Sequence, residues 1–295
     1  MISFQLVIEQ ILNGLLSGSM YTLMAIGLSL IWGILGIFNF AHGAFYMLGG
    51  YFTYYLIAYL GLNPFISVII SAIAIFFVGM VLEIIFIRPL NQFQGTEFHL
   101  LATAIVTLGL AIFLENIILL TFGGATETVA PVIPGKVTIG FYSVSKQIIA
   151  VFFITGSSLL GIALFVRYTK TGLAMLSLAQ DHLGASLVGV NYNRIYPITF
   201  GVSATLAGIA GALLAPVYSI NPTVGWTVFP YSLIVVIMAG LGSLKGVIFA
   251  GFLIGLIKGI GTIWITQQWV MPIFFGLVIL IVLMKPSGLF GVREI

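Results

Sequence analysis

Few side chains in this sequence could carry out covalent chemistry, and none has the spacing of a known catalytic motif. His42, His99 and His182 lie far apart, and neither the H-E-x-x-H nor the G-x-S-x-G pattern occurs. The chain has no cysteine, which excludes disulfides and thiolate metal sites. The segment GLGSLKG, Gly240 to Gly246, lacks the G-x-x-x-x-G-K-[ST] spacing of a nucleotide-binding loop. We therefore expect a protein that is not an enzyme and that holds no metal, cofactor or nucleotide of its own.

The polar residues that stand out lie in NFAHGAFYMLGG, Asn39 to Gly50. In a purely structural interpretation, Asn39 caps a helix that begins near Phe40, His42 lies on its first turn, and the glycines allow close packing. In a functional interpretation, the helices break here beside a water-filled pathway, where Asn39 and His42 offer hydrogen bonds to a passing molecule. Both interpretations stay open at the level of sequence.

Composition indicates the kind of element that positions these residues. The chain is 61% hydrophobic and 6% charged, with a mean hydropathy of +1.24, whereas soluble domains carry about 25% charged residues. The solvent over most of its surface must therefore be lipid. The net charge of +3 comes from scattered residues and forms no nucleic-acid patch. The start, MISFQLVIEQ, lacks a charged n-region and a cleavage site, so we expect a retained span.

Long apolar runs in a membrane predict helices, because the backbone there must satisfy its own hydrogen bonds. We expect an all-α polytopic protein with 8–9 transmembrane helices in one bundle, and a single domain over 1–295. The predicted spans are Ser3–Trp32, Phe40–Leu60, Pro64–Ile87, Phe98–Leu120, Ile148–Val166, Ile195–Tyr218, Trp226–Leu244, Gly246–Thr266 and Trp269–Met284. The first is long enough to be tilted or broken, Pro230 interrupts the seventh, and the last is short.

Two longer polar segments separate these spans. Residues 121–146 contain Gly/Pro punctuation and the alternating stretch KVTIGFYSV, which predict a loop with a short hairpin. Residues 167–194 contain helix formers. Thr171 and Asp181 are candidate N-caps of two short helices, and Gly189 could end the second. An apolar stripe at helical spacing runs through Leu176, Leu183 and Leu187. Such helices could lie on the bilayer or dock into a cytoplasmic protein, and the Gly/Ser/Asn content favours a protein partner.

Basic residues set the predicted orientation, since short cytoplasmic loops are enriched in them. With 167–194 in the cytoplasm, the cytoplasmic set is Arg88, Arg167, Lys170, Arg194, Lys245, Lys285 and Arg293. Lys136 and Lys146 then lie outside, and Lys258 falls within a span. The C-terminus is cytoplasmic. The N-terminus is outside if nine segments cross and inside if eight do.

Glycines and charges within the spans have predicted packing roles. Gly251, Gly255 and Gly259 recur every four residues and form a flat strip for close helix packing. The charged residues in or near spans are Glu9, Glu83, Glu115 and Lys258. We expect snorkelling or capping for each glutamate, and we expect Lys258 to reach an interface along its stem.

Four blocks of the sequence resemble the LivH-type branched-chain amino acid ABC transporter permeases. GLSLIWGILGIFNFAHGAFYMLGGYFTYYL resembles that family's N-terminal signature, and LATAIVTLGLAIFLENIILLTFG its third block. TGLAMLSLAQDHLGASLVGVN resembles its cytoplasmic coupling loop, although Leu183 replaces the glutamate of the general EAA pattern. INPTVGWTVFPYSLIVVIMAGLGSLKGVIFAGFLIGLI is similar to its C-terminal block. The blocks follow the family's order over nearly the whole chain.

The resemblance implies a multi-pass permease subunit in the inner membrane of a prokaryote. Its implied partners are a second, homologous permease, two cytoplasmic ATPases, an extracytoplasmic binding protein and the lipid bilayer, with no nucleic acid. Residues 167–194 would be the coupling loop, with ATPase contacts at Leu178, Asp181, His182, Leu183, Gly184, Ala185, Leu187 and Gly189. The candidate pathway residues are Asn39, His42, Thr107, Asn221 and Ser243.

Two other functions remain open from the sequence. Relatives within the same family transport urea or short-chain amides, and the sequence does not separate them from amino acid permeases. A secondary carrier driven by an ion gradient would need carboxylates within the membrane, for which Glu83 and Glu115 are the candidates.

Overall fold

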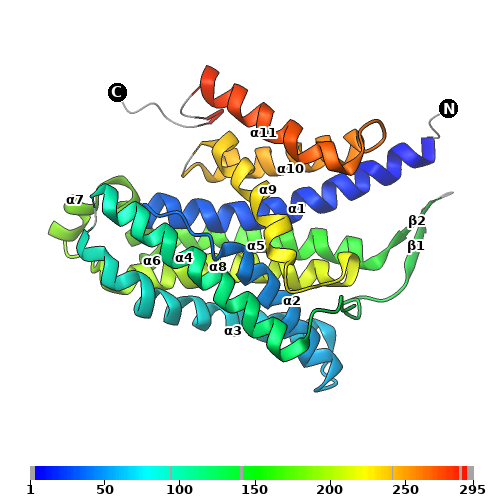
Figure 1. Ribbon diagram of the computed structural model, residues 1–295, viewed down its shortest axis with the longest axis horizontal. Helices are drawn as coiled ribbons and strands as arrows, with labels where there is room; N and C mark the ends of the chain where they lie inside the picture. The colour runs from blue at the N-terminus through cyan, green and yellow to red at the C-terminus, as the bar shows by residue number, and fades with distance from the viewer. Residues whose placement is uncertain (1–3, 94, 140–141, 241, 286–287, 291–295) are drawn as a thin grey trace.

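The computed structural model describes residues 4–93, 95–139, 142–240, 242–285 and 288–290. Its elements form one elongated bundle of helices with a small hairpin (Figure 1). In chain order they are α1 (Phe4–Leu35), α2 (His42–Ala58), α3 (Pro64–Leu82) continued by a π-helical turn (Glu83–Ile87) and a 3-10 turn (Arg88–Phe93), α4 (Glu97–Phe122), β1 (Lys136–Ile139), β2 (Tyr142–Ser145), α5 (Lys146–Tyr168), α6 (Lys170–Gln180), α7 (His182–Leu187), α8 (Tyr192–Tyr218), α9 (Val224–Ala239), α10 (Leu244–Gly261) and α11 (Gln267–Met284).

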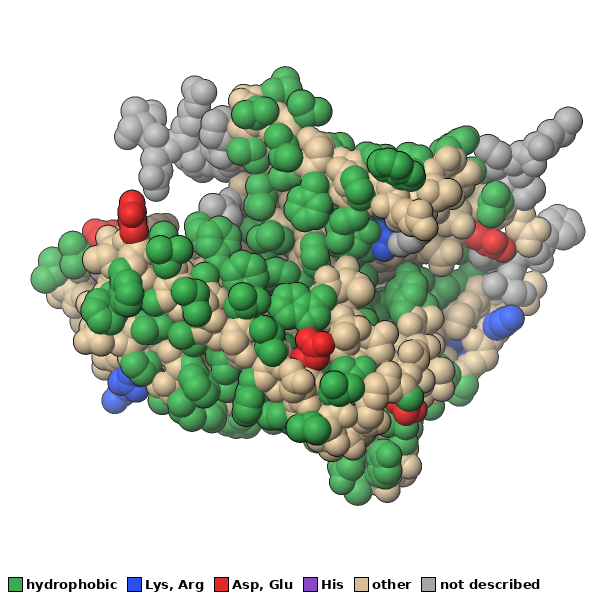
Figure 2. Space-filling view, viewed as in Figure 1, with side chains coloured by type: hydrophobic (Ala, Val, Ile, Leu, Met, Phe, Trp, Pro, Cys, Tyr) green, Lys and Arg blue, Asp and Glu red, His purple; other side chains and the backbone are tan. Residues whose placement is uncertain are grey.

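The protein is an all-α, polytopic membrane protein. Among the described residues, six helices are long and apolar enough to cross a bilayer, namely α1, α3 with its extension, α4, α5, α8 and α10. The helices α9 and α11 are apolar but shorter, and α2 has 17 residues. The face seen in Figure 2 carries many apolar side chains and few charged ones. Ile105, Leu120 and Phe153 are 70%, 87% and 76% exposed, which suits contact with lipid rather than water.

The bundle has two distinct ends, which we call the α7 end and the hairpin end. The helix α7 lies at one end and the hairpin β1–β2 at the other, and α1 starts at the hairpin end whereas α11 finishes at the α7 end (Figure 1). The described cations at helix termini of the α7 end are Arg88, Arg167, Lys170, Arg194, Lys245 and Lys285. Lys136 and Lys146 lie at the hairpin end. The predicted cytoplasmic cations therefore share one end, except Arg293, which lies outside the described residues.

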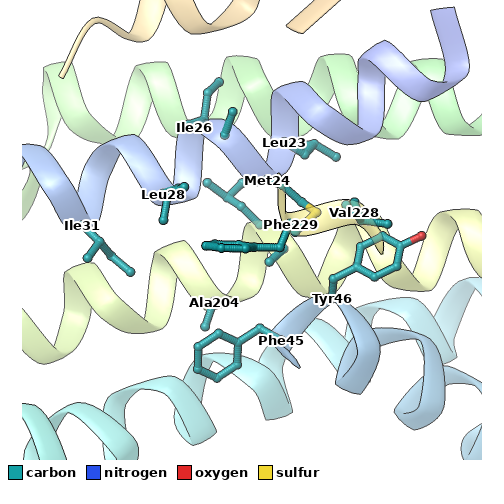
Figure 3. Packing of buried hydrophobic residues seen from close by; sticks show 14 of the residues in the cluster. Leu23, Met24, Ile26, Leu28, Ile31, Phe45, Tyr46, Ala204, Val228 and Phe229 are labelled. Atoms are coloured by element: carbon teal, nitrogen blue, oxygen red, sulfur yellow. The ribbon is translucent and has the colours of Figure 1, made fainter. Parts of the chain in front are cut away.

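The core surrounds α1 and α8. Met24 and Ile31 of α1, Phe45 of α2, Ala204 of α8 and Phe229 of α9 belong to one cluster of buried hydrophobic side chains (Figure 3). A Cβ added to Gly211 of α8 would collide with the backbone of α2. This close approach explains how a bundle so rich in small residues buries its central helices.

The predicted glycine strip faces α1. A Cβ on Gly255 would overlap backbone atoms of Gly14 and Gly18, and a Cβ on Gly259 would overlap Gly14. Gly251 meets Thr22 in the same way. Thus α1 and α10 approach each other through glycines on both helices.

Several predicted boundaries differ from the structure. The first span, for which the sequence left a tilted or a broken helix open, is one continuous helix of 32 residues. Pro230 lies inside α9 without ending it. The predicted helix from Phe40 begins at His42, with Ala41 as its N-cap.

Local turn signals were more reliable. The hairpin is present in KVTIGFYSV, with Val137 paired to Val144. Asp181 stands at the N-cap position of α7, although its side chain accepts no capping hydrogen bond, and Gly189 follows that helix with φ +92°. The N-cap of α6 is Thr169 rather than Thr171, because the Thr169 hydroxyl accepts the Gly172 amide at 3.0 Å.

Candidate functional site

The helix pair α6–α7 is held against the bundle by a few buried contacts. Met175 and Leu178 of α6 are buried, and α6 packs on α5, α1 and α8. Gly172 permits the close approach to α5, since a Cβ there would overlap the backbone of Phe165 and Val166. A displacement of α6 would therefore push directly on α5, α1 and α8.

The short helix α7 presents apolar side chains outward. Ala185 is 4% exposed and anchors the helix, whereas Leu183 and Leu187 are 76% and 88% exposed. Val188, at 81%, continues the same surface. After it, the Gly189 amide donates to the Ser186 carbonyl, and the next amide donates to Ala185, which closes the helix. An apolar surface at a charged end of the protein is suited to docking a partner.

The surroundings of α7 connect it to the ends of α1 and α4. A cavity of about 840 Å³ is lined by Leu178, His182 and Leu183. Residues 33–36, at the end of α1 and just after it, line the same cavity. His99 of α4 borders the same space. The His182 ring also lies 5.2 Å from the ring of Tyr192. Asp181 and Gly184 touch each other at the helix start, since a Cβ on Gly184 would meet the Asp181 carboxylate.

The first three residues of NFAHG, Asn39 to Ala41, belong to a non-helical segment, residues 36–41, and the last two begin α2. The Asn39 carboxamide oxygen accepts the Ala41 amide at 3.0 Å. The Thr107 hydroxyl of α4 accepts the Phe40 amide at 3.1 Å. Its single proton is shared between the Phe38 carbonyl at 3.2 Å and the Ala104 carbonyl of its own helix at 3.1 Å. Because non-helical backbone at membrane depth must find partners in the protein, these two side chains explain why polar residues lie here.

His42 fixes the depth at which α2 begins. Its Nε2 donates to the Met24 carbonyl oxygen at 2.8 Å, and the ring is fully buried. Met24 precedes the end of α1 at Leu35 by about 16 Å of helix. The segment 36–41 therefore returns from the α7 end into the interior, and α2 starts there.

The helix α9 also starts in the interior, against the start of α2. A Cβ on Gly43 would overlap the carbonyl of Gly225, and a Cβ on Gly225 would overlap the carbonyl of Gly43. Two helices that begin beside each other inside a bundle are typical of proteins with a central transport pathway.

The five predicted pathway residues do not form one cluster. Asn39, His42 and Thr107 lie around the segment 36–41, all 0–1% exposed. Asn221 lines a cavity of about 440 Å³ toward the hairpin end. Ser243 lines another cavity, of about 750 Å³, at the α7 end, where its hydroxyl caps α10 by accepting the Gly246 amide at 3.2 Å.

Lys258 and its neighbours were missed as site residues. Lys258, which we expected to reach an interface, lies in the last turn of α10. Its Nζ donates to the Tyr21 hydroxyl at 2.6 Å and lies 4.6 Å from the centre of the Tyr231 ring. All three residues line the cavity that contains Asn221. A lone charge in the middle of a predicted span was the available signal.

The carboxylates near the membrane are separated from one another. Glu83 is fully buried beside the α7 end, and within the described residues neither of its oxygens has a hydrogen-bond partner, contrary to the expected snorkelling. Glu115, toward the other end of α4, accepts a hydrogen bond from the Trp226 indole. They form no relay with each other. Among the described residues, no group of three His, Asp or Glu side chains is placed to hold a metal ion.

Comparison with known proteins defines the class to which this arrangement belongs. The family model described as branched-chain amino acid transport system / permease component matches residues 10–283. The chain is therefore a member of this family of transport permeases.

Individual relatives span nearly the whole chain. The high-affinity branched-chain amino acid transport system permease protein BraD of Pseudomonas aeruginosa is 32% identical, over 98% of this chain and 97% of that protein. The permease protein LivH of Escherichia coli is 30% identical, over 98% of this chain and 96% of LivH. LivM of Salmonella typhimurium, named as a high-affinity branched-chain amino acid transport system permease protein, is 26% identical. The match covers 91% of this chain and 67% of LivM. No solved structure matches the chain.

Proposed function

We propose that this protein is the permease subunit of an ABC importer and forms the membrane pathway for branched-chain amino acids. The observation that carries the proposal is the match to BraD and LivH, both named as branched-chain amino acid permeases, over 98% of this chain. Hydrolysis of ATP belongs to separate subunits, since the sequence contains no nucleotide-binding loop.

The proposed assembly has four kinds of component, and its two permeases lie in the inner membrane of a prokaryote. The similarity to LivM supports a second, homologous permease beside this one. Two cytoplasmic ATPases bind the α7 end, and an extracytoplasmic binding protein delivers substrate to the hairpin end. The clustering of Lys and Arg at helix termini of the α7 end supports this orientation.

The proposed topology has nine crossings. In this arrangement α2 and α9 complete their crossings through the non-helical segments 36–41 and 219–223. The start of α1 and the end of α11 lie at opposite ends of the bundle, which supports an odd number of crossings (Figure 1). The N-terminus then lies outside and the C-terminus in the cytoplasm.

The coupling segment, Leu178–Val190, transmits movement of the ATPases. Leu183 and Leu187 insert into a groove of an ATPase, as amphipathic helices do in such partners. Because α6 packs on α5, α1 and α8, a push on α7 tilts these helices and switches the bundle between outward and inward openings. Nucleotide drives the switch only by binding the two states with different affinity.

Reconstitution tests the proposal directly. The permease pair, the ATPases and the binding protein are placed in vesicles, and uptake of labelled leucine, isoleucine, valine and urea is measured with and without ATP. The proposal predicts ATP-dependent uptake of the three amino acids. Uptake of urea alone would assign the protein to the amide-transporting branch, and uptake driven by an ion gradient without ATP would identify a secondary carrier.

A further inference from the structure

Lys258 is a partly buried cation in the last turn of α10, and its hydrogen-bond and ring partners carry no negative charge. Its Nζ donates to the Tyr21 hydroxyl and lies over the rings of Tyr21 and Tyr231, at 5.3 and 4.6 Å from their centres. In the part of the chain that the structure describes, it forms no ion pair with a carboxylate. An ammonium group has three donors, so the phenol leaves hydrogen-bonding capacity toward the space beside it.

That space is a cavity of about 440 Å³, a size typical of small-molecule sites. Its lining includes the polar residues Ser17, Tyr46, Tyr218, Asn221 and Thr227, and the apolar residues Met20, Val224, Val228 and Met271. Tyr46 of α2 and Val228 of α9, one of each kind, lie close together (Figure 3). We call this space the lysine cavity.

We propose that the lysine cavity is a transient site for the substrate, in which Lys258 binds the carboxylate of a zwitterionic amino acid. This inference rests on the proposed function and adds the place and the chemistry of recognition. The substrate ammonium finds acceptor oxygens on Asn221, Ser17 and Tyr218. Its branched aliphatic side chain lies against Met20 and Val228, which offer no competing polar group.

Packing alone gives no reason for a charge at this position. A methionine would fill the same space without the desolvation of an ammonium group, since it is flexible and apolar. Charged residues inside a membrane bundle generally mark the route of a charged or polar substrate. The rings of Tyr21 and Tyr231 stabilise the cation while the cavity is empty, so the lysine does not need a carboxylate of the protein, which would compete with the substrate.

The first test uses substitutions in the complete transporter reconstituted in vesicles. Lys258→Met should lower leucine uptake about tenfold or more in complexes shown to assemble, the effect expected for loss of a charge-assisted hydrogen bond. Lys258→Arg keeps the cation and should retain most of the uptake. Lys245→Met, at the exposed start of the same helix, is the matched control and should behave as the wild type.

Two failures are distinguishable in this experiment. If the wild type takes up no leucine, isoleucine or valine, the proposed function is wrong, and this inference falls with it. If the wild type transports them and Lys258→Met transports equally well, only the lysine cavity is wrong.

A second measurement does not depend on transport and covers a Lys258→Met complex that fails to assemble. Because the chain has no cysteine, a single Thr227→Cys can be labelled with a small water-soluble thiol reagent in the assembled transporter. Leucine at millimolar concentration should slow this labelling, whereas leucinol, which lacks the carboxylate, should not. Thr121→Cys, at the exposed end of α4, should label at the same rate with either compound. Equal protection by leucine and leucinol, or none by leucine, would overturn the proposal.

Discussion

The hydroxyl of Thr107 on α4 lies 3.1 Å from the amide nitrogen of Phe40 and accepts its hydrogen bond. The same hydroxyl lies 3.2 Å from the Phe38 carbonyl oxygen. One side chain thus accepts the Phe40 amide and shares its single proton between the Phe38 carbonyl and the Ala104 carbonyl of its own helix at 3.1 Å. Non-helical backbone within a membrane protein needs such partners from the protein itself. The polar residues of NFAHG and their partner on α4 therefore make it possible for α2 to begin inside the bundle.

Thr107→Val should destabilise the protein, because it leaves the buried Phe40 amide without an acceptor. The expected loss is about 1–3 kcal/mol in the free energy of unfolding, measured by equilibrium unfolding in mixed micelles. Thr107→Ser keeps the hydroxyl and serves as the matched control, with a smaller loss. If valine is as stable as serine, the hydroxyl does not support the segment.

Gly255→Ala should also be destabilising, because the added Cβ overlaps the backbone of α1 at Gly14 and Gly18. Overpacking of this kind costs about 1–3 kcal/mol, and the midpoint of thermal unfolding should fall accordingly. Gly276→Ala on α11 is the control, since a Cβ there meets nothing within 4 Å. Equal midpoints for the two variants would show that α1 and α10 do not pack as described.

Leu187→Asp should prevent binding of the ATPases while the permease still folds. The side chain is 88% exposed, so the fold loses little, but a docking surface would gain a desolvated charge. Copurification of the ATPases with a tagged permease should be lost with aspartate and retained with Leu187→Met. Retention with aspartate would place the docking surface elsewhere.

Gly189→Val should uncouple transport from ATP hydrolysis. Gly189 has φ +92°, a conformation that a β-branched residue adopts only with strain, so the end of α7 must change shape. Substrate uptake should fall to background, while the amount of inserted protein stays at the wild-type level. Wild-type uptake together with wild-type stimulation of ATP hydrolysis would refute the coupling role.

The sequence predicted those features that local signals determine. The hairpin followed from alternation in KVTIGFYSV, and the start and end of α7 followed from Asp181 and Gly189. The predicted spans left residues 33–39 between two helices, and one interpretation of NFAHG placed a helix break there. The sequence did not indicate that Thr107 supports this backbone, because that residue lies in another helix. Capping preferences also failed to distinguish Thr169 from Thr171, since both residues precede the same apolar stretch.

The lysine cavity could not be predicted for a related reason. Lys258 was identified as unusual, but its partners Tyr21 and Tyr231 lie on α1 and α9, and only the packed bundle brings them together. Asn221 and Ser243 looked equivalent in sequence, as polar residues beside spans. The structure separates them, because one lines a cavity toward the hairpin end and the other caps a helix at the α7 end.

The most direct test of the account asks which side of the membrane α7 faces. A single cysteine at Leu187 is treated with a membrane-impermeant maleimide in intact cells and in inside-out vesicles, with a single cysteine at Val137 of the hairpin as the opposite marker. The account predicts labelling of the Leu187 position only in the vesicles and of the Val137 position only in the cells. Labelling of the Leu187 position in intact cells would contradict it, because no ATP-driven partner could then reach the helix.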